Sequence, residues 1–180
     1  MKSSFWKSGV CVVAAAILVG CGPSPVATVP PASEMSSTAT PSSDVLLKSQ
    51  PADAKPVGEL RASVADGAAV TILGRIGGDT NPWVEGRAAF TIVDPKLEPC
   101  HPDEGCPTPW DYCCSTDQLP THRALIKIVD GAGDTIEQDA RKLLGVKELQ
   151  TVMVRGQAKR DTAGNLTVLA SGVYVVPEVK

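Results

Sequence analysis

Aromatic side chains and histidines are scarce in this sequence. Its 180 residues include only three Trp, two Tyr, two Phe and two His. No Gly-x-Ser-x-Gly turn, phosphate-binding glycine loop or His-Glu-x-x-His pair occurs, so no pattern supplies a nucleophile, a nucleotide site or a catalytic zinc site. We therefore expect a non-catalytic protein without a cofactor, which acts by recognition or by structural support.

The sequence also lacks an apolar run long enough to cross a bilayer, which takes about 20 residues. The uninterrupted apolar run at residues 10–19 has only ten residues. Lys2 and Lys7 precede it, and a positive start followed by a short apolar segment is typical of a secretory leader. We expect residues 1–20 to be removed during export.

The expected leader ends in Leu18, Val19 and Gly20, and Cys21 follows. These four residues resemble a bacterial lipobox, the signal for lipoprotein maturation. The resemblance implies cleavage before Cys21, acyl chains on this cysteine, and attachment to a membrane of the bacterial cell envelope with the domain facing the periplasm or the exterior. Gly22 follows instead of the Asp that retains lipoproteins in the inner membrane of well-studied systems, so the outer membrane is favoured. Several acyl chains would make the anchor effectively permanent.

Residues 22–56 have the composition of a flexible tether. Of these 35 residues, 22 are Pro, Ser, Thr or Ala, and none is aromatic. Such a segment cannot bury enough apolar surface to offset its ordering entropy. We expect a disordered tether that spans roughly 30–35 Å as a flexible coil. One folded domain at residues 57–180 follows it.

The expected domain contains five segments in which apolar and polar residues alternate, which predicts five β-strands. These segments are residues 70–76, 87–93, 123–129, 152–158 and 166–176. Gly74 interrupts the first strand and predicts a bulge or a sharp bend there. Between the third and fourth strands, Asp134 and Glu137 form a capping-box pattern and Gly145 follows an apolar stripe, which predicts a helix over 134–145.

Three strands, one helix and two strands in this order are typical of an OB-fold, a five-stranded Greek-key barrel. The segments VTILGRI, GRAAFTIVD and TVMVRGQAKRDTAGNLTVLASGVYV resemble the first, second and final strands of OB-fold domains of the anticodon-binding and small envelope-protein kind. The chain also resembles uncharacterised bacterial envelope lipoproteins that carry such a domain. The resemblance covers about residues 70–176 and implies an all-β barrel in the envelope, but no activity.

A 29-residue segment with little periodicity, 94–122, separates the second and third expected strands. Loops of this length in a compact domain are usually functional or cross-linked. All four cysteines of the expected domain lie in it, at Cys100, Cys106, Cys113 and Cys114. In an oxidising compartment, an even number of clustered cysteines favours disulfides. A bond between the adjacent Cys113 and Cys114 would be strained, so we expect each of them to pair separately with Cys100 or Cys106.

A metal site is the main alternative for this segment. The four thiols, with His101 and His122 nearby, are ligands that zinc or copper(I) accepts. No Cys-x-x-Cys pair occurs, and adjacent ligands on one ion are geometrically demanding, so the pattern favours disulfides over a metal. A redox switch that uses the vicinal pair Cys113 and Cys114 is a further alternative.

Recognition residues are expected among the few aromatics. Trp83 lies between the first two strands, and Trp110 and Tyr112 lie in the cysteine-rich segment. We hypothesise that these three residues and Arg87 form a patch for a glycan, a peptide or a partner protein of the envelope, because the first inter-strand loop of an OB-fold borders its ligand face. The alternative is that Trp110 and Tyr112 cover the disulfides as a local core.

Charge argues against a nucleic-acid partner, although oligonucleotide binding is common among OB-folds. Residues 57–180 contain 13 Lys and Arg against 17 Asp and Glu, a net charge of −4. Single-strand binders use a positive groove that follows the phosphates. The small basic cluster of Arg155, Lys159 and Arg160 is explained by ordinary solvated surface, so nucleic-acid binding is not expected.

Overall fold

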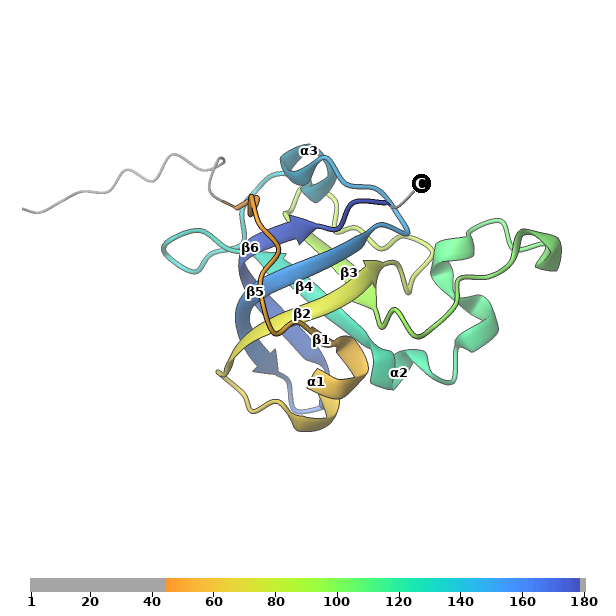
Figure 1. Cartoon of the computed structure of the whole chain (residues 1–180), viewed down its shortest axis with the longest axis horizontal. Coiled ribbons are helices and arrows are strands. Elements are labelled where there is room, and N and C mark those ends of the chain that lie inside the picture. The colour runs from red at the N-terminus through yellow and green to blue at the C-terminus, as the bar shows by residue number, and fades with distance from the viewer. Residues whose placement is uncertain (1–44, 179–180) are drawn as a thin grey trace, which may run out of the picture. The chain divides into compact units, whose positions relative to one another are not determined.

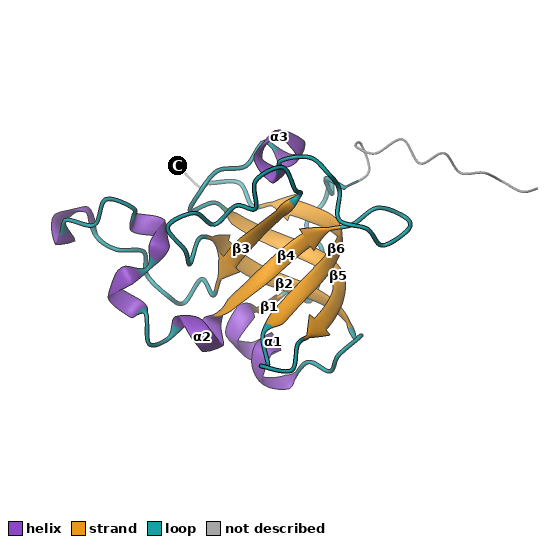
Figure 2. Cartoon of the chain, turned by 180° about the vertical axis from the view of Figure 1, so that it is seen from behind, coloured by secondary structure: helices purple, strands orange, loops and turns teal. Residues whose placement is uncertain are grey.

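The strands of the folded region close into a barrel, as the computed structural model shows for residues 45–178 (Figures 1 and 2). The barrel strands are β2 (Ala69–Ile76), β3 (Ala89–Val93), β4 (Arg123–Ile128), β5 (Thr151–Arg160) and β6 (Leu166–Val175). They follow the order β2-β3-β4-β6-β5, and pairing of β5 with β2 closes the ring. Only β4 and β6 pair in parallel within this ring. The expectation of an all-β, closed five-stranded barrel with few helices is confirmed.

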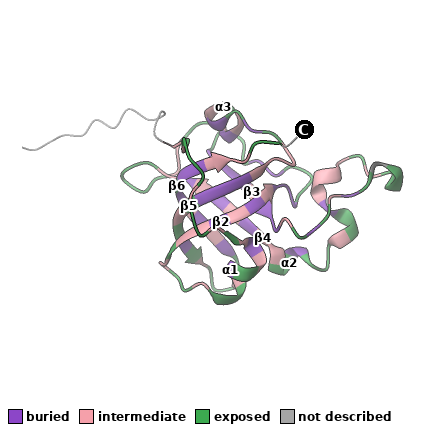
Figure 3. Ribbon diagram, in the orientation of Figure 1, coloured by how far each residue is buried: buried purple, intermediate pink, exposed green. Residues whose placement is uncertain are grey.

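Alternating apolar residues of the strands fill the barrel interior. Ile72 and Ile76 of β2, Phe90 and Ile92 of β3, and Ile126 of β4 are fully buried and belong to one core cluster. The buried positions continue around the ring in Figure 3. Because successive side chains of a strand point to opposite faces, the period-two pattern of the sequence indicated both the strands and their inner faces.

Two glycines permit close contacts between strands. A Cβ on Gly74 would lie 2.6 Å from Cδ1 of Ile92, so this glycine makes room for a core side chain. The expected bulge is not at Gly74. The register shift lies instead in β5, between Arg155 and Gly156, where a Cβ on Gly156 would overlap the backbone oxygen of Leu169.

The helix between β4 and β5 is shorter than expected. Helix α3 spans Ala140–Leu144, and its cap is Asp139, not Asp134. The backbone of Ile136 is held by the barrel, since its N–H donates to the Ile128 carbonyl at 3.0 Å. Because the backbone of Ile136 forms this strand-like hydrogen bond, Ile136 cannot belong to a helix. The helix therefore begins only after Ile136. Gly145 ends the helix as expected, with a left-handed φ of 68°.

The folded domain begins before the expected boundary at residue 57. The expected leader, Cys21 and the expected tether as far as residue 44 lie outside the described residues, but residues 45–56 run along the barrel. The Leu47 N–H donates to the Val173 carbonyl at 2.8 Å, and β1 (Lys55–Pro56) pairs in parallel with β2. The last twelve residues assigned to the tether are therefore part of the domain.

An unexpected helix, α1 (Val57–Ser63), follows β1 directly. Val57 and Leu60 contribute to the barrel core, which explains why this short segment is ordered. Its first turn is capped from a distant part of the chain, because the Gly58 N–H donates to Oδ2 of Asp94 at 2.7 Å. Among the described residues, no helix combines the length and the apolar character that crossing a membrane requires.

Candidate metal centre

The segment between β3 and β4 extends from one end of the barrel (Figure 1). It consists of three single-turn 3-10 helices, Pro102–Glu104, Pro109–Asp111 and Cys113–Ser115, followed by the short helix α2 (Leu119–His122). Prolines fix the φ angle at the start of several of these turns. A small core of its own, separate from that of the barrel, holds the segment in place; it consists of Val93, Leu97, Tyr112 and Leu119.

Four cysteines of this segment bring their sulfur atoms together, and we call Cys100, Cys106, Cys113 and Cys114 the thiol cluster. All four Sγ atoms lie within 4.8 Å of one another. The Sγ of Cys113 lies 3.3 Å from that of Cys100 and 3.0 Å from that of Cys106. The Sγ of Cys114 lies 3.8 Å from that of Cys106. Cys100 is buried, Cys106 is half-buried, and the other two are exposed.

The adjacent cysteines both point into the cluster because of the backbone at Tyr112. This residue has a left-handed φ of 57°, and a tight 3-10 turn begins directly after it. As a result, the Sγ atoms of Cys113 and Cys114 lie 3.9 Å apart. The geometric objection to two adjacent ligands on one ion therefore does not hold in this turn.

Carboxylates support the backbone around the cluster. Asp111 accepts hydrogen bonds from the Thr108 hydroxyl at 2.6 Å and from the Cys113 N–H at 2.8 Å. The hydrogen bond from Thr108 is the main cause that holds the pKa of Asp111 below its usual value, and the bond from the Cys113 N–H adds to it. The Asp111 carboxylate is therefore ionised. Glu104 accepts from the His101 N–H at 2.8 Å and lies 3.4 Å from the Cys114 Sγ. The sequence carried no pattern that distinguished Asp111 and Glu104 from other acidic loop residues.

The thiols interact too strongly to ionise independently. The pKa of Cys114 is raised to about 12, mainly by its hydrogen bond with Cys100 and next by that with Cys106. The pKa of Cys113 is also raised, mainly by its hydrogen bond with Cys106. For Cys100, burial raises the pKa, but hydrogen bonds from the Cys114 backbone and the neighbouring thiols outweigh burial and lower it. The reason is electrostatic: several thiolates in contact repel one another unless protons or a cation lie between them.

Neither histidine joins the cluster. The His101 side chain is exposed, and its Nδ1 lies 3.2 Å from a carboxylate oxygen of Asp103. His122 ends α2, where its Nδ1 lies 3.1 Å from the Gln118 carbonyl. Of the six ligands considered from the sequence, the structure brings together the four cysteines and leaves both histidines outside.

The hypothesised aromatic patch does not form on the surface. Trp83 is 5% exposed and Tyr112 is fully buried, and they belong to two different core clusters. The indole N–H of Trp110 donates to the Thr80 carbonyl at 3.1 Å. This residue therefore joins the segment between β3 and β4 (residues 94–122, called the insertion below) to the loop after β2. Arg87 forms a separate exposed ion pair with Glu137 at 2.9 Å. The rings of Trp83 and Tyr112 are buried in the cores because burial of a large aromatic ring stabilises the folded domain.

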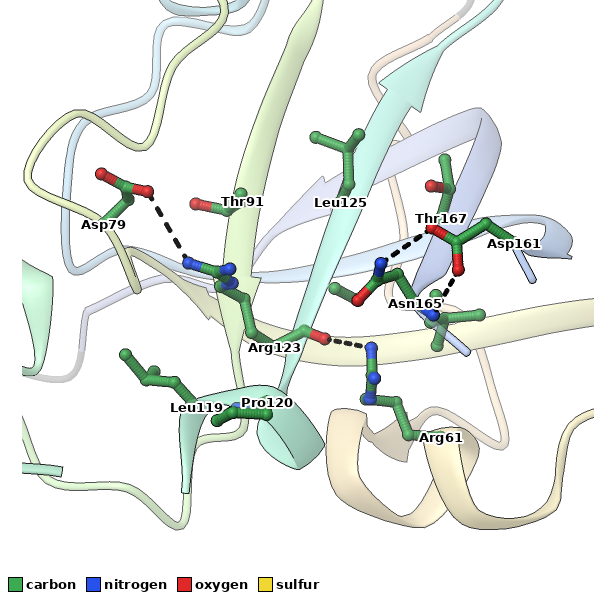
Figure 4. Close-up of a pocket in the computed structure, with 12 residues that line it drawn as sticks. Arg61, Asp79, Thr91, Leu119, Pro120, Arg123, Leu125, Asp161, Asn165 and Thr167 are labelled. Atoms are coloured by element: carbon green, nitrogen blue, oxygen red, sulfur yellow. Dashed lines mark hydrogen bonds and ion pairs between the residues drawn. The ribbon is translucent and has the colours of Figure 1, made fainter. Parts of the chain in front are cut away.

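A groove of about 350 Å³ lies on the outer face of the barrel, between α1, α2 and the turn after β5 (Figure 4). Its lining includes Arg61, Thr91, Arg123, Asn165 and Thr167. The guanidinium of Arg61 donates to the Arg123 carbonyl at 2.9 Å, and that of Arg123 donates to the Gly78 carbonyl at 2.8 Å. Both arginines thus hold the walls of the groove together.

Comparison with known proteins does not place this chain in a family. No protein-family model matches it, and no curated protein sequence matches it. Its function therefore has to be inferred from the thiol cluster and from the surface of the barrel.

Proposed function

We propose that this chain is a lipid-anchored, non-catalytic module of a bacterial cell envelope, in which an OB-fold barrel carries a four-thiolate site for a divalent metal ion of the zinc type. The observation that carries the metal assignment is the mutual proximity of the four sulfurs, all within 4.8 Å. The strand order and the parallel pairing of β4 with β6 support the OB-fold assignment. The lipobox-like residues that end in Cys21 support the anchor.

The arrangement of the thiol cluster favours an ion over the disulfides expected from the sequence. Two disulfides constrain only two of the six distances among four sulfurs, whereas a tetrahedral ion constrains all six. All six are short here, and the sulfur contacts of 3.0–3.9 Å exceed a disulfide bond length of about 2.05 Å. For zinc–sulfur bonds of about 2.3 Å, a regular tetrahedron has edges of about 3.8 Å, which lies within the observed range.

Charge favours a divalent ion over copper(I). Four thiolates carry a charge of about −4, and the ionised Asp111 and the nearby Glu104 add to the negative potential at the cluster. A divalent cation neutralises more of this charge than a monovalent one. Thiolate ligands suit zinc as well as copper(I), so charge is the feature that separates the two ions here.

The proposed ion acts as a structural brace. Four protein ligands fill a tetrahedral shell and leave no open position for substrate, which is typical of structural zinc sites. The braced segment contacts the barrel where the Gly78 N–H donates to the Trp110 carbonyl at 2.7 Å. The ion would thereby fix the insertion relative to the loop after β2 and shape the outer surface at this end of the domain.

Metal analysis of the full-length chain tests whether the thiol cluster binds a structural ion. Purified under reducing conditions and incubated with zinc, the chain should retain one ion, and cobalt(II) should give the visible bands of a tetrahedral thiolate complex. The Cys106→Ser/Cys114→Ser double variant should lose both signals, whereas Ser115→Ala in the same turn should keep them. A reduced chain that retains no ion would contradict the metal site and favour the disulfides expected from the sequence.

The anchor has its own test. Cys21→Ser should release the chain from the membrane fraction and abolish incorporation of labelled palmitate, with no change in zinc content. A Cys21→Ser chain that stays in the membrane and keeps its label would contradict the lipid anchor.

Recognition by the groove is a second candidate function. OB-folds commonly bind ligands over their second and third strands, beside the loop that joins the last two strands. The groove has this position, since β3, β4 and the turn after β5 line it. Its lining is rich in hydrogen-bonding groups and contains no aromatic platform, which favours a peptide or glycan over nucleic acid. Thr167→Arg should abolish crosslinking of an envelope partner in native membranes, and Val84→Arg on the exposed loop after β2 should not.

A further inference from the structure

The thiol cluster contains two sulfur pairs that share no atom and are both in contact. The Sγ atoms of Cys100 and Cys113 lie 3.3 Å apart, and those of Cys106 and Cys114 lie 3.8 Å apart. We infer, on the basis of the proposed metal site, that metal binding is controlled by oxidation: conversion of these two pairs into disulfides releases the ion, and reduction restores the site.

The ion and the disulfides exclude each other for a chemical reason. A metal ligand is a thiolate, whereas the sulfur of a disulfide is neutral and a weak donor. The carboxylates of Asp111 and Glu104 remain near the oxidised sulfurs, but two separate oxygen ligands cannot replace a tetrahedral thiolate shell. The ion is therefore lost when both disulfides form.

Exposure determines which sulfurs react first. Cys113 and Cys114 are exposed, so a small disulfide oxidant reaches them from solvent, whereas Cys100 is buried. One exposed thiolate attacks the oxidant and forms a mixed disulfide, and one thiolate of the oxidant leaves. The protein thiolate in contact with that sulfur then displaces the second thiolate of the oxidant.

Each round balances in electrons and atoms. Two protein thiolates lose two electrons and form one S–S bond, and the oxidant accepts these electrons as its own S–S bond breaks. Two rounds convert four thiolates and one divalent ion into two protein disulfides, one free ion and four small-molecule thiolates. The total charge is the same before and after.

The pairing follows from the geometry of the turn. A bond between Cys113 and Cys114 joins adjacent residues, whose Cα atoms about 3.8 Å apart are closer than a disulfide usually permits. The pairing of Cys100 with Cys113 and of Cys106 with Cys114 uses two contacts already present. The remaining pairing would join Cys106 with Cys113, whose sulfurs lie 3.0 Å apart, and leave Cys100 to bond with Cys114, so peptide mapping distinguishes the two connectivities.

The test begins with the reduced, zinc-loaded full-length chain. Oxidised glutathione is added, free zinc is followed with a chromogenic chelator, and disulfides are mapped by peptide mass spectrometry. We expect one zinc ion released for every two disulfides formed, with the connectivity stated above, and full rebinding after reduction and addition of zinc. Ser115→Ala should behave like the parent chain.

Double variants that leave one expected pair test the pairing in the metal-free chain. After oxidation, Cys100→Ser/Cys113→Ser should form the bond between Cys106 and Cys114, and Cys106→Ser/Cys114→Ser that between Cys100 and Cys113. Zinc that stays bound while both disulfides form, or a bond between Cys113 and Cys114, would overturn the inference and leave the metal site standing. A reduced chain that binds no zinc would overturn the inference and the metal site together.

Discussion

The carboxylate of Asp94 accepts a hydrogen bond from the Gly58 N–H at 2.7 Å, although 36 residues separate the two in sequence. Asp94 is buried and begins the insertion directly after β3, whereas Gly58 lies in the first turn of α1. The second oxygen of the carboxylate accepts from the Lys96 N–H at 2.9 Å. One side chain thus satisfies a helix terminus and the first turn of the insertion.

Replacement of Asp94 should destabilise the whole domain. Asp94→Ala leaves the Gly58 and Lys96 N–H groups without this acceptor, and we expect the free energy of unfolding to fall by about 1–3 kcal/mol. Urea unfolding of the full-length chain measures the change. Asp117→Ala, at an exposed position of the same insertion, is the control and should shift stability by less than about 0.5 kcal/mol. Equal losses in both variants would contradict the role of Asp94.

Tyr112 should tolerate loss of its hydroxyl but not loss of its ring. The side chain is fully buried, and its hydroxyl has no hydrogen-bond partner within the part of the chain that the structure describes. Tyr112→Phe removes an unsatisfied polar group and should be neutral or stabilising by up to about 1 kcal/mol. Tyr112→Ala opens a cavity in the small core and should cost about 3–5 kcal/mol. Thermal unfolding separates the two variants, and a marked loss in Tyr112→Phe would reveal a partner for the hydroxyl.

Gly156 should be intolerant of any side chain. A Cβ there would overlap the backbone oxygen of Leu169 on β6, and strand pairing leaves that backbone little freedom to move. We expect Gly156→Ala to lower stability by more than about 2 kcal/mol, which is typical of overpacking. Gly131 has no atom near its ideal Cβ, so Gly131→Ala should be neutral or stabilising by about 0.4–1 kcal/mol. Chemical denaturation compares the pair, and similar midpoints would contradict the close contact.

Stability should depend on pH through Asp139. Its hydrogen bond with the Arg141 side chain lowers the pKa of Asp139 to about 2, below its ordinary value near 3.9. The folded state therefore favours the ionised carboxylate, and this contribution is present above about pH 4 and lost as pH falls towards 2. The stability difference between the parent chain and Asp139→Asn should shrink over this interval in denaturation series at fixed salt. A difference that stays constant from pH 7 to pH 2 would show that the carboxylate charge is not involved.

The barrel strands could be predicted from sequence because their signal is local. In β2, Ile72 and Ile76 on one face, opposite Thr71 and Arg75, identified the inner face before any contact was known. Helix α3 was misplaced because the capping pattern at Asp134 is also local, whereas the hydrogen bond from the Ala88 N–H to the Ile136 carbonyl joins residues far apart in sequence. The hydrogen bond from the Leu47 N–H to the Val173 carbonyl likewise joins residues too far apart in sequence for composition to reveal.

For the functional site, the sequence by itself determined which chemistry is available: four thiols within 15 residues, with two of them adjacent. It also determined the strands and their inner faces, since strand periodicity follows from side-chain geometry along the chain. Only the tertiary structure decided that the four sulfurs converge and that Trp83 and Tyr112 belong to separate cores. The physical reason is that convergence depends on the left-handed backbone of Tyr112 and on packing between residues distant in sequence, and neither leaves a periodic pattern in the chain.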